Sequence, residues 1–263
     1  MACVTLLLAS RFLFAGSQVN ARTIIEQSVA ANARDWEAAP QFECFQTTRE
    51  PGQPSKTYHE LMILGSPYEE LVADNGKPLS QQQQDAEKQK LHDEIARRQE
   101  ESSSRRSDRI GRYEKDRDRD HLLMQQLSIA FTFTLVGSRT LNGHAVYLLN
   151  AVPKPDYQPP NMEAKVLKGM RGRLWIDQKT FQWLRVEAEV VQPVSIEGFL
   201  AEVEPGTRFE LEKGPVTDGI WLPTHFAMKS DARVLHFFTR RSAEDDRYFN
   251  YQKAPDSNKL RPQ

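Results

Sequence analysis

Apolar and charged positions alternate through residues 168–213, and this alternation predicts antiparallel β-strands. Within residues 181–191, every second side chain is apolar: Leu184, Val186, Ala188 and Val190. Most of the side chains between them are charged. This period of two is typical of a strand with one buried face and one wet face. The same alternation recurs around Phe209 and Leu211, so the chain is expected to be organised around a large antiparallel sheet.

Strand-like patterns also occur on both sides of this region. They cover residues 42–48, 57–64, 68–73, 131–136, 145–152, 221–229, 234–241 and 248–251. Asn75-Gly76 and Asn142-Gly143 favour tight hairpin turns. The total is about ten strands, nearly all consecutive and antiparallel. We therefore predict an α+β fold built on a large curved antiparallel sheet, an incomplete β-barrel with helices on one side.

Two regions have helical patterns. Residues 22–36 place Ile24, Ile25, Val29 and Ala33 near helical spacing, which predicts an N-terminal helix. Residues 81–120 contain 11 acidic and 11 basic residues. They predict a solvated helix or helical hairpin, broken near residues 102–104, within an insertion over residues 80–127. An electrostatic binding arm is the alternative, but the charges alternate and cancel.

Residues 1–21 are expected to be a secretory signal peptide. A short apolar stretch is followed by Val19-Asn20-Ala21, a cleavage site with small residues, so we predict cleavage after Ala21, a single domain over residues 22–263 and a periplasmic location. The alternative is an N-terminal core helix. The mature chain has no other apolar segment of transmembrane length. The whole chain has a net charge of −1, which argues against a nucleic-acid partner.

Three short segments carry a resemblance to a known family. They are GRLWID at residues 172–177, GIWLP at residues 219–223 and, as weaker support, DNGKPL at residues 74–79. With the order of strands and helices, they make the chain resemble the periplasmic lipoprotein carrier (LolA/LolB-like) superfamily, of the outer-membrane lipoprotein-sorting type. The resemblance implies an unclosed antiparallel barrel whose concave apolar face holds acyl chains, with helices acting as a lid.

Catalytic signatures are missing from the sequence. We find no Gly-x-Ser-x-Gly, His-Glu-x-x-His, Walker or Cys-x-x-Cys motif. A turn at Ser230-Asp231 would place His225 opposite His236, but neither strand supplies the further ligands that a metal site needs. A second group, from His92 to His121, lies in the solvated charged helix. We therefore expect neither enzymatic activity nor a cofactor or bound metal.

The expected function is binding of a lipid, or of the acyl chain of a lipoprotein, in the apolar concave sheet, with a role as a lipid or lipoprotein carrier. Alternation alone assigns nine residues to the inward face: Phe131, Phe133, Leu135, Leu184, Val186, Phe209, Leu211, Leu222 and Phe226. The alternative is an envelope protein-interaction module with a filled core and no ligand, which would bind a protein partner through the charged helices.

Overall fold

The computed structural model describes residues 20–195, 201–217, 219–234 and 238–255. The predicted signal peptide lies outside the described residues, apart from its last two positions. In the part of the chain that is described, no helix is long and apolar enough to cross a membrane.

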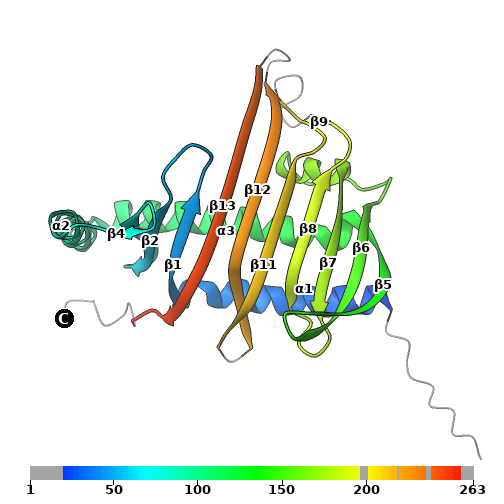
Figure 1. Ribbon diagram of the computed structural model, residues 1–263, viewed down its shortest axis with the longest axis horizontal. Coiled ribbons are helices and arrows are strands. Elements are labelled where there is room, and N and C mark those ends of the chain that lie inside the picture. Colours follow the sequence, from blue (N-terminus) through cyan, green and yellow to red (C-terminus); the bar gives the residue numbers. More distant parts are fainter. Residues whose placement is uncertain (1–19, 196–200, 218, 235–237, 256–263) are drawn as a thin grey trace, which may run out of the picture.

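An open antiparallel sheet forms the body of the protein, and eleven strands follow one another across it (Figure 1). From edge to edge they are β4 (Lys77–Pro78), β3 (Ser66–Asp74), β2 (Lys56–Ile63), β1 (Phe42–Arg49), β13 (Phe238–Lys253), β12 (Ile220–Val234), β11 (Arg208–Thr217), β8 (Trp183–Val190), β7 (Met170–Asp177), β6 (His144–Pro153) and β5 (Phe131–Leu141). The short strands β9 (Val194–Ser195) and β10 (Ala201–Val203) extend β12. The predicted α+β architecture with an unclosed sheet is confirmed.

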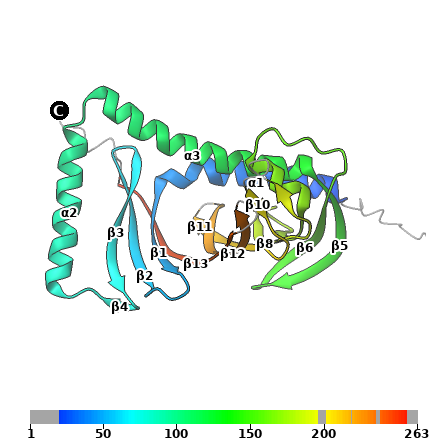
Figure 2. The same ribbon diagram turned by 90° about the horizontal axis from the view of Figure 1, so that it is seen from above.

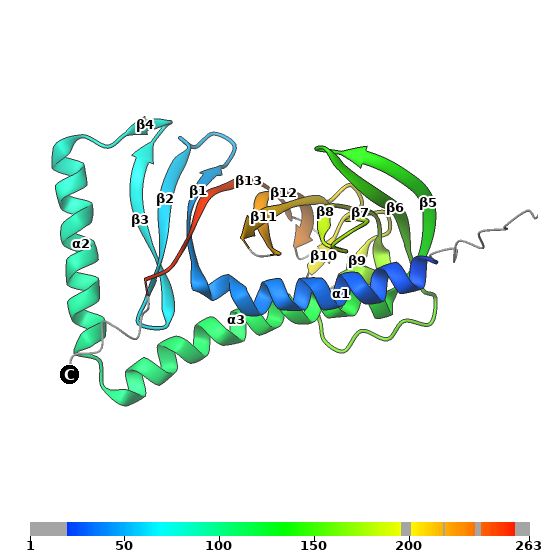
Figure 3. The same cartoon turned by 90° about the horizontal axis from the view of Figure 1, so that it is seen from below.

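The strand order requires a long connection between β4 and β5. Because β1 pairs with β13, the two edge strands β4 and β5 are neighbours in sequence but lie at opposite ends of the sheet. Helices α2 (Gln81–Gln99) and α3 (Ser103–Ala130) connect them. The 28 residues of α3 span about 42 Å. Figures 2 and 3 show α3 running beside α1 (Ala21–Ala38) across one face of the sheet, while α2 stands beside the β3 edge.

Local chemistry sets the helix boundaries. The side chain of Asn20 accepts a hydrogen bond from the backbone N–H of Thr23 and so caps α1. Cleavage after Ala21 would remove this cap. Ser80 and Gln83 form a capping box at the start of α2. The predicted break in the charged segment is confirmed, because α2 ends at Gln99 and α3 begins at Ser103.

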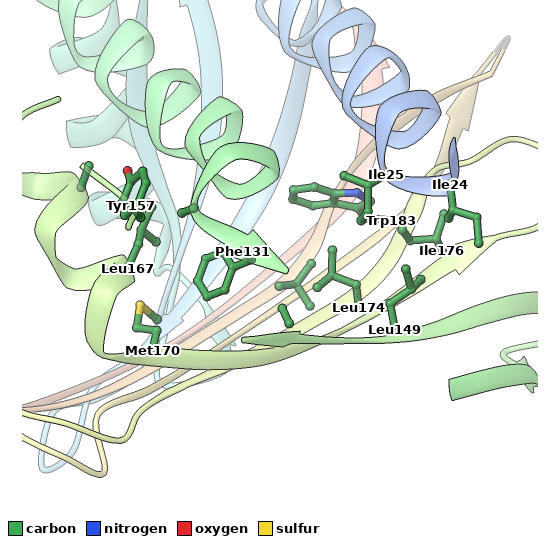
Figure 4. Packing of buried hydrophobic residues seen from close by; sticks show 14 of the residues in the cluster. Ile24, Ile25, Phe131, Leu149, Tyr157, Leu167, Met170, Leu174, Ile176 and Trp183 are labelled. Atoms are coloured by element: carbon green, nitrogen blue, oxygen red, sulfur yellow. The ribbon is translucent and has the colours of Figure 1, made fainter. Parts of the chain in front are cut away.

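The hydrophobic core lies between the helices and the β5 to β8 half of the sheet. Figure 4 shows Ile24 and Ile25 of α1 above Leu149, Leu174 and other apolar side chains of the strands. The 3₁₀ segment Glu163–Gly169 covers one side of this core and contributes Leu167 to it. We call the face of the sheet that carries these core residues the inner face, and the opposite face the outer face.

The hairpin predictions made from Asn-Gly pairs are correct. Asn75 and Gly76 join β3 to β4, and Asn142 and Gly143 join β5 to β6, all four with positive φ. The prediction of three separate strands after residue 220 is wrong. Two long strands, β12 and β13, pair in unbroken register from His225 to Val234. Pro223 does not end a strand because it stands at a register shift in the β11–β12 pair.

Candidate functional site

Most of the nine side chains predicted to face inward do lie on the inner face. Phe131 and Val186 are buried in the main core, and half-buried Phe133, Leu135, Phe209 and Leu211 pack against it. Leu222 is 3 % exposed, and Phe226 is half-buried opposite Leu211. Many of these residues therefore fill a core rather than line an open cavity.

Leu184 is the exception, because it packs with Val146 and Trp221 in a second cluster, together with Trp175. Trp175 and Val146 alternate with core residues of their own strands, so they point away from the main core. A register shift between β7 and β8 causes the error. Trp175 pairs with Arg185 and Ile176 with Trp183, which leaves Leu184 as the extra residue of a bulge.

An apolar pocket of about 200 Å³ lies between helices α1 and α3 and the inner face of the sheet. We call it the α1/α3 pocket. The helices contribute Val29, Ala33, Trp36, His121 and Met124, and the sheet contributes Trp183, Leu211, Trp221, Leu222 and Pro223. Only two of the nine predicted residues, Leu211 and Leu222, line this pocket. Most of the others surround a smaller gap of about 30 Å³ beneath Leu127.

A buried ion pair lies in the wall of the α1/α3 pocket. The Nζ of Lys213 on β11 is 2.6 Å from Oδ2 of Asp35 on α1, and it also donates to Oδ1 of Asn32 at 2.8 Å. The other oxygen of Asp35 accepts from the backbone N–H of Trp221 and from Nε2 of Gln182, both at 3.0 Å. Burial lowers the pKa of Lys213, while Asp35 acts to raise it. The pocket therefore has mainly apolar walls and one polar side, where the charges of Lys213 and Asp35 neutralise each other.

Two indole N–H groups in the pocket wall have no partner among the described residues. They are the Nε1 atoms of Trp36 and Trp183, both buried. An unpaired buried donor is costly, but each nitrogen has less than 1 Å² of accessible surface and is covered by protein rather than open to the pocket. The lining of the pocket is therefore mainly apolar and suits an apolar chain.

Trp36 also links helices α1 and α3. Its ring stacks on His121 of α3 with centroids 4.2 Å apart, and the guanidinium of Arg117 lies 4.4 Å from the same ring. Arg117 further donates to the backbone carbonyl of Trp36 at 2.7 Å. Burial lowers the pKa of His121, which favours the neutral ring at this contact. Opening the pocket would require these contacts to break.

A larger hollow of about 800 Å³ lies over β6, β7, β8, β11 and β12, but most of its charged side chains already form ion pairs. Glu189 binds Arg208 at 2.8 Å and Arg171 at 3.3 Å. Nearby, Glu210, Glu212 and His225 bring potential metal-ligating atoms within 4.8 Å. Arg185 pairs with Glu210 at 2.8 Å and lies 3.7 Å from Glu212. This arrangement is a ladder of ion pairs, and the α1/α3 pocket is the better candidate site.

The facing-histidine arrangement considered from the sequence is wrong. His225 lies opposite Arg247 in the sheet and contacts Asp245 at 3.2 Å, while His236 lies outside the described residues. Sequence reasoning also missed Trp36, His121 and Met124, because it assigned the binding face to strands alone. The helical pattern around these residues can be recognised in the sequence. The packing of α1 against α3 over this part of the sheet cannot.

Comparisons with known proteins return distant likenesses of fold. No protein-family model matches the chain, and no curated protein matches it. Among solved structures, a LolA superfamily protein from Nitrosomonas europaea is similar with a TM-score of 0.32 and 12% identity, covering 93% of this chain and 98% of that one. A putative outer membrane lipoprotein-sorting protein domain from Vibrio parahaemolyticus has a TM-score of 0.31 and 10% identity, covering 87% and 92%.

A DUF1329 family protein from Desulfovibrio piger has a TM-score of 0.31 and 12% identity, with coverages of 87% and 92%. The solved structures that resemble this chain thus include a member of the superfamily that its sequence resembles. Because these TM-scores are low, the functional argument rests on the pocket itself.

Proposed function

We propose that this protein binds a lipid or the acyl chain of a lipidated partner, without catalysis, and that the α1/α3 pocket is its binding site. The observation that carries the proposal is the apolar lining of this pocket between two helices and the sheet. Each methylene buried there contributes about 0.8 kcal/mol.

The proposed setting is the periplasm, after removal of the predicted signal peptide, and a carrier role would follow if bound cargo is handed on. The lid contacts of Trp36 with His121 and Arg117 would then control access. The ligand-binding roles of Leu211 and Leu222 are retained from the sequence. For Phe131 and Phe133 we propose a lesser role. They would contact the end of the acyl chain if it extends into the small gap beneath Leu127.

The test is binding of a fluorescent fatty acid to the purified protein. Met124→Trp fills the pocket from the α3 side and is expected to abolish binding. Ile129→Trp is the matched control, because Ile129 lies on the same helix and is 54 % exposed. Circular dichroism establishes that both variants fold. Unchanged binding by folded Met124→Trp would remove the pocket as the site.

Native mass spectrometry with lipid extraction provides an independent measurement. A co-purifying acyl species in near one-to-one ratio supports the proposal. A protein free of lipid, even after incubation with lipids, would favour the alternative, a protein-interaction module. For that alternative, α2 is the segment to test, because its outward side chains are charged and exposed while it packs on β3.

A further inference from the structure

Three carboxylates gather near β13, beyond the apolar part of the inner face. Glu244 and Asp246 are two residues apart on the strand and so share a face. Glu50, at the end of β1, acts electrostatically on Glu244. Asp246 is 3 % exposed, and its Oδ2 receives a long hydrogen bond of 3.4 Å from Tyr248. Its Oδ1 is buried without a partner among the described residues.

These carboxylates lack the compensation that other acids of this protein have. Among the side chains that the structure describes, no Lys or Arg forms an ion pair with Glu50, Glu244 or Asp246. By contrast, Asp245, which faces the outer side of the same strand, lies within 4 Å of His225, Arg49 and Arg247. Burial raises the pKa of Glu244, and the charge of Asp246 and a hydrogen bond to the Asp246 side chain raise it further. Buried negative charge without a counter-charge is unfavourable, so this group would gain from a bound cation.

The acids are connected to the α1/α3 pocket by an apolar row. Leu211, which lines the pocket, lies opposite Phe226, and Phe226 lies opposite Asp246. Residues directly opposite in an antiparallel pair point to the same side. Two strand spacings separate Leu211 from Asp246, or about 10 Å. In the next row, Phe209, Met228 and Glu244 repeat the arrangement.

We propose that the ligand is a cationic amphiphile, with its apolar chain in the α1/α3 pocket and an ammonium group on the carboxylates of Asp246 and Glu244. This inference rests on the proposed function and specifies its ligand class. Phe226 and Met228 are half-buried and would contact the part of the chain between the two ends. A fatty acid in the same pose would place its own carboxylate against like charges, which disfavours it.

The test compares three ligands that share a twelve-carbon chain: dodecylammonium, dodecanol and laurate. Binding to the full protein is measured by isothermal titration calorimetry below the concentrations at which these compounds aggregate. Dodecylammonium is expected to bind at least about tenfold more tightly than dodecanol. Laurate is expected to bind more weakly than either. The advantage of dodecylammonium should shrink as the salt concentration rises.

Variants that neutralise single carboxylates test which of them bind the ammonium group. Asp246→Asn and Glu244→Gln are each expected to remove most of the preference for dodecylammonium, because they weaken its binding far more than that of dodecanol. Asp245→Asn is the matched control, because this neighbouring carboxylate faces the outer side and should leave all three affinities unchanged. If Asp246→Asn fails to fold, the partly exposed Glu244 supplies the decisive variant.

The outcomes separate this inference from the proposed function. Equal binding of all three ligands would overturn the cationic preference and leave the acyl-binding pocket standing. A preference that survives in both Asp246→Asn and Glu244→Gln would also overturn the inference. Failure of every ligand to bind would overturn the proposed function, and the inference would fail with it.

Discussion

The ammonium group of Lys213 lies 2.6 Å from the carboxylate of Asp35, and both side chains are almost fully buried. Burying two charges is costly, but here each charge has further hydrogen bonds. Asn32 accepts from Lys213, and Asp35 accepts from Trp221 and Gln182. The pair thereby pins the last turns of α1 to β11 and β12. Loss of one partner would leave the other charge buried and unpaired.

We therefore expect Lys213→Met to lower the free energy of unfolding by about 3–5 kcal/mol. Asp35→Leu should cost at least as much, because Trp221 and Gln182 would also lose their acceptor. The double variant should lose much less than the sum of the two single losses. Urea denaturation of all four proteins provides the double-mutant cycle. Additive losses would show that the pair is not coupled.

Arg98 is expected to hold the β2–β3 turn and the charged helices together. It is 4 % exposed, and its guanidinium donates to the backbone carbonyls of Ile63, Ser66 and Pro67. The turn includes Leu64 at a positive φ of 46°, a strained conformation for leucine. Arg98→Met should leave these carbonyls unsatisfied and cost about 3 kcal/mol or more.

Arg97→Met is the control for this variant. Arg97 is the adjacent residue, but its side chain is 57% exposed, and its ion pairs among the described residues are with Glu94 and Glu101. A surface ion pair of this kind contributes about 1 kcal/mol or less. Thermal and urea unfolding of the two variants should therefore differ clearly. Similar losses would mean that Arg98 does not organise the turn.

The parts of the fold that were predictable from the sequence depend on local rules. The alternation in β8 and β11, the Asn-Gly turns and the helical spacing near Ile24 each involve residues close in sequence. The pairing of β1 with β13 has no local signal. Without it, residues 81–120 looked like an insertion, whereas in the structure they are a bridge between the two sheet edges.

The candidate site was less predictable because it depends on contacts between distant segments. Asp35 and Lys213 are 178 residues apart, and nothing in the spacing of either indicates the other. Leu184 was misplaced because strict alternation does not allow for a bulge. Most of the apolar strand residues lie on the inner face, as alternation predicts, but the helices decide where space remains between them.

Replacement of glycine by alanine is expected to have opposite effects on stability at Gly169 and Gly111. A Cβ on Gly169 would clash with the side chain of Val194 and lie 2.6 Å from the backbone oxygen of Gln192. Gly169→Ala should therefore cost about 1–3 kcal/mol through overpacking. Gly111 lies inside α3, and a Cβ there meets nothing within 4 Å. Gly111→Ala should stabilise the protein by about 0.5–1 kcal/mol.

Melting temperatures of the two variants, measured in one buffer, check this pair of predictions. A decrease for Gly169→Ala with an increase for Gly111→Ala is expected. The same sign in both would contradict the close packing at Gly169 or the helical register of α3 at Gly111.

The thiol of Cys44 should be inert in the folded protein. Cys44 is 5 % exposed, and its Sγ lies 3.9 Å from a carboxylate oxygen of Glu60. Burial, followed by the charge of Glu60, raises the pKa of Cys44 to about 12. Because the thiolate is the reactive form, a Cys3→Ser protein should react with a thiol reagent at pH 8 much more slowly when folded than in urea. Equal rates would contradict this burial.

The same raised pKa should appear in the pH dependence of stability. In the unfolded chain, the thiol loses its proton near pH 9.0, whereas in the folded protein it remains protonated to about pH 12. The folded state then binds more protons, so the contribution of this thiol to stability is constant below pH 9 and falls as pH rises through this window. The slope from one thiol is at most about 1.4 kcal/mol per pH unit.

Cys44→Ala removes this contribution. The difference in unfolding free energy between the original protein and Cys44→Ala, measured in urea titrations, should therefore change between pH 8 and pH 10. A constant difference would show that the thiol ionises as readily in the folded protein as in the unfolded chain.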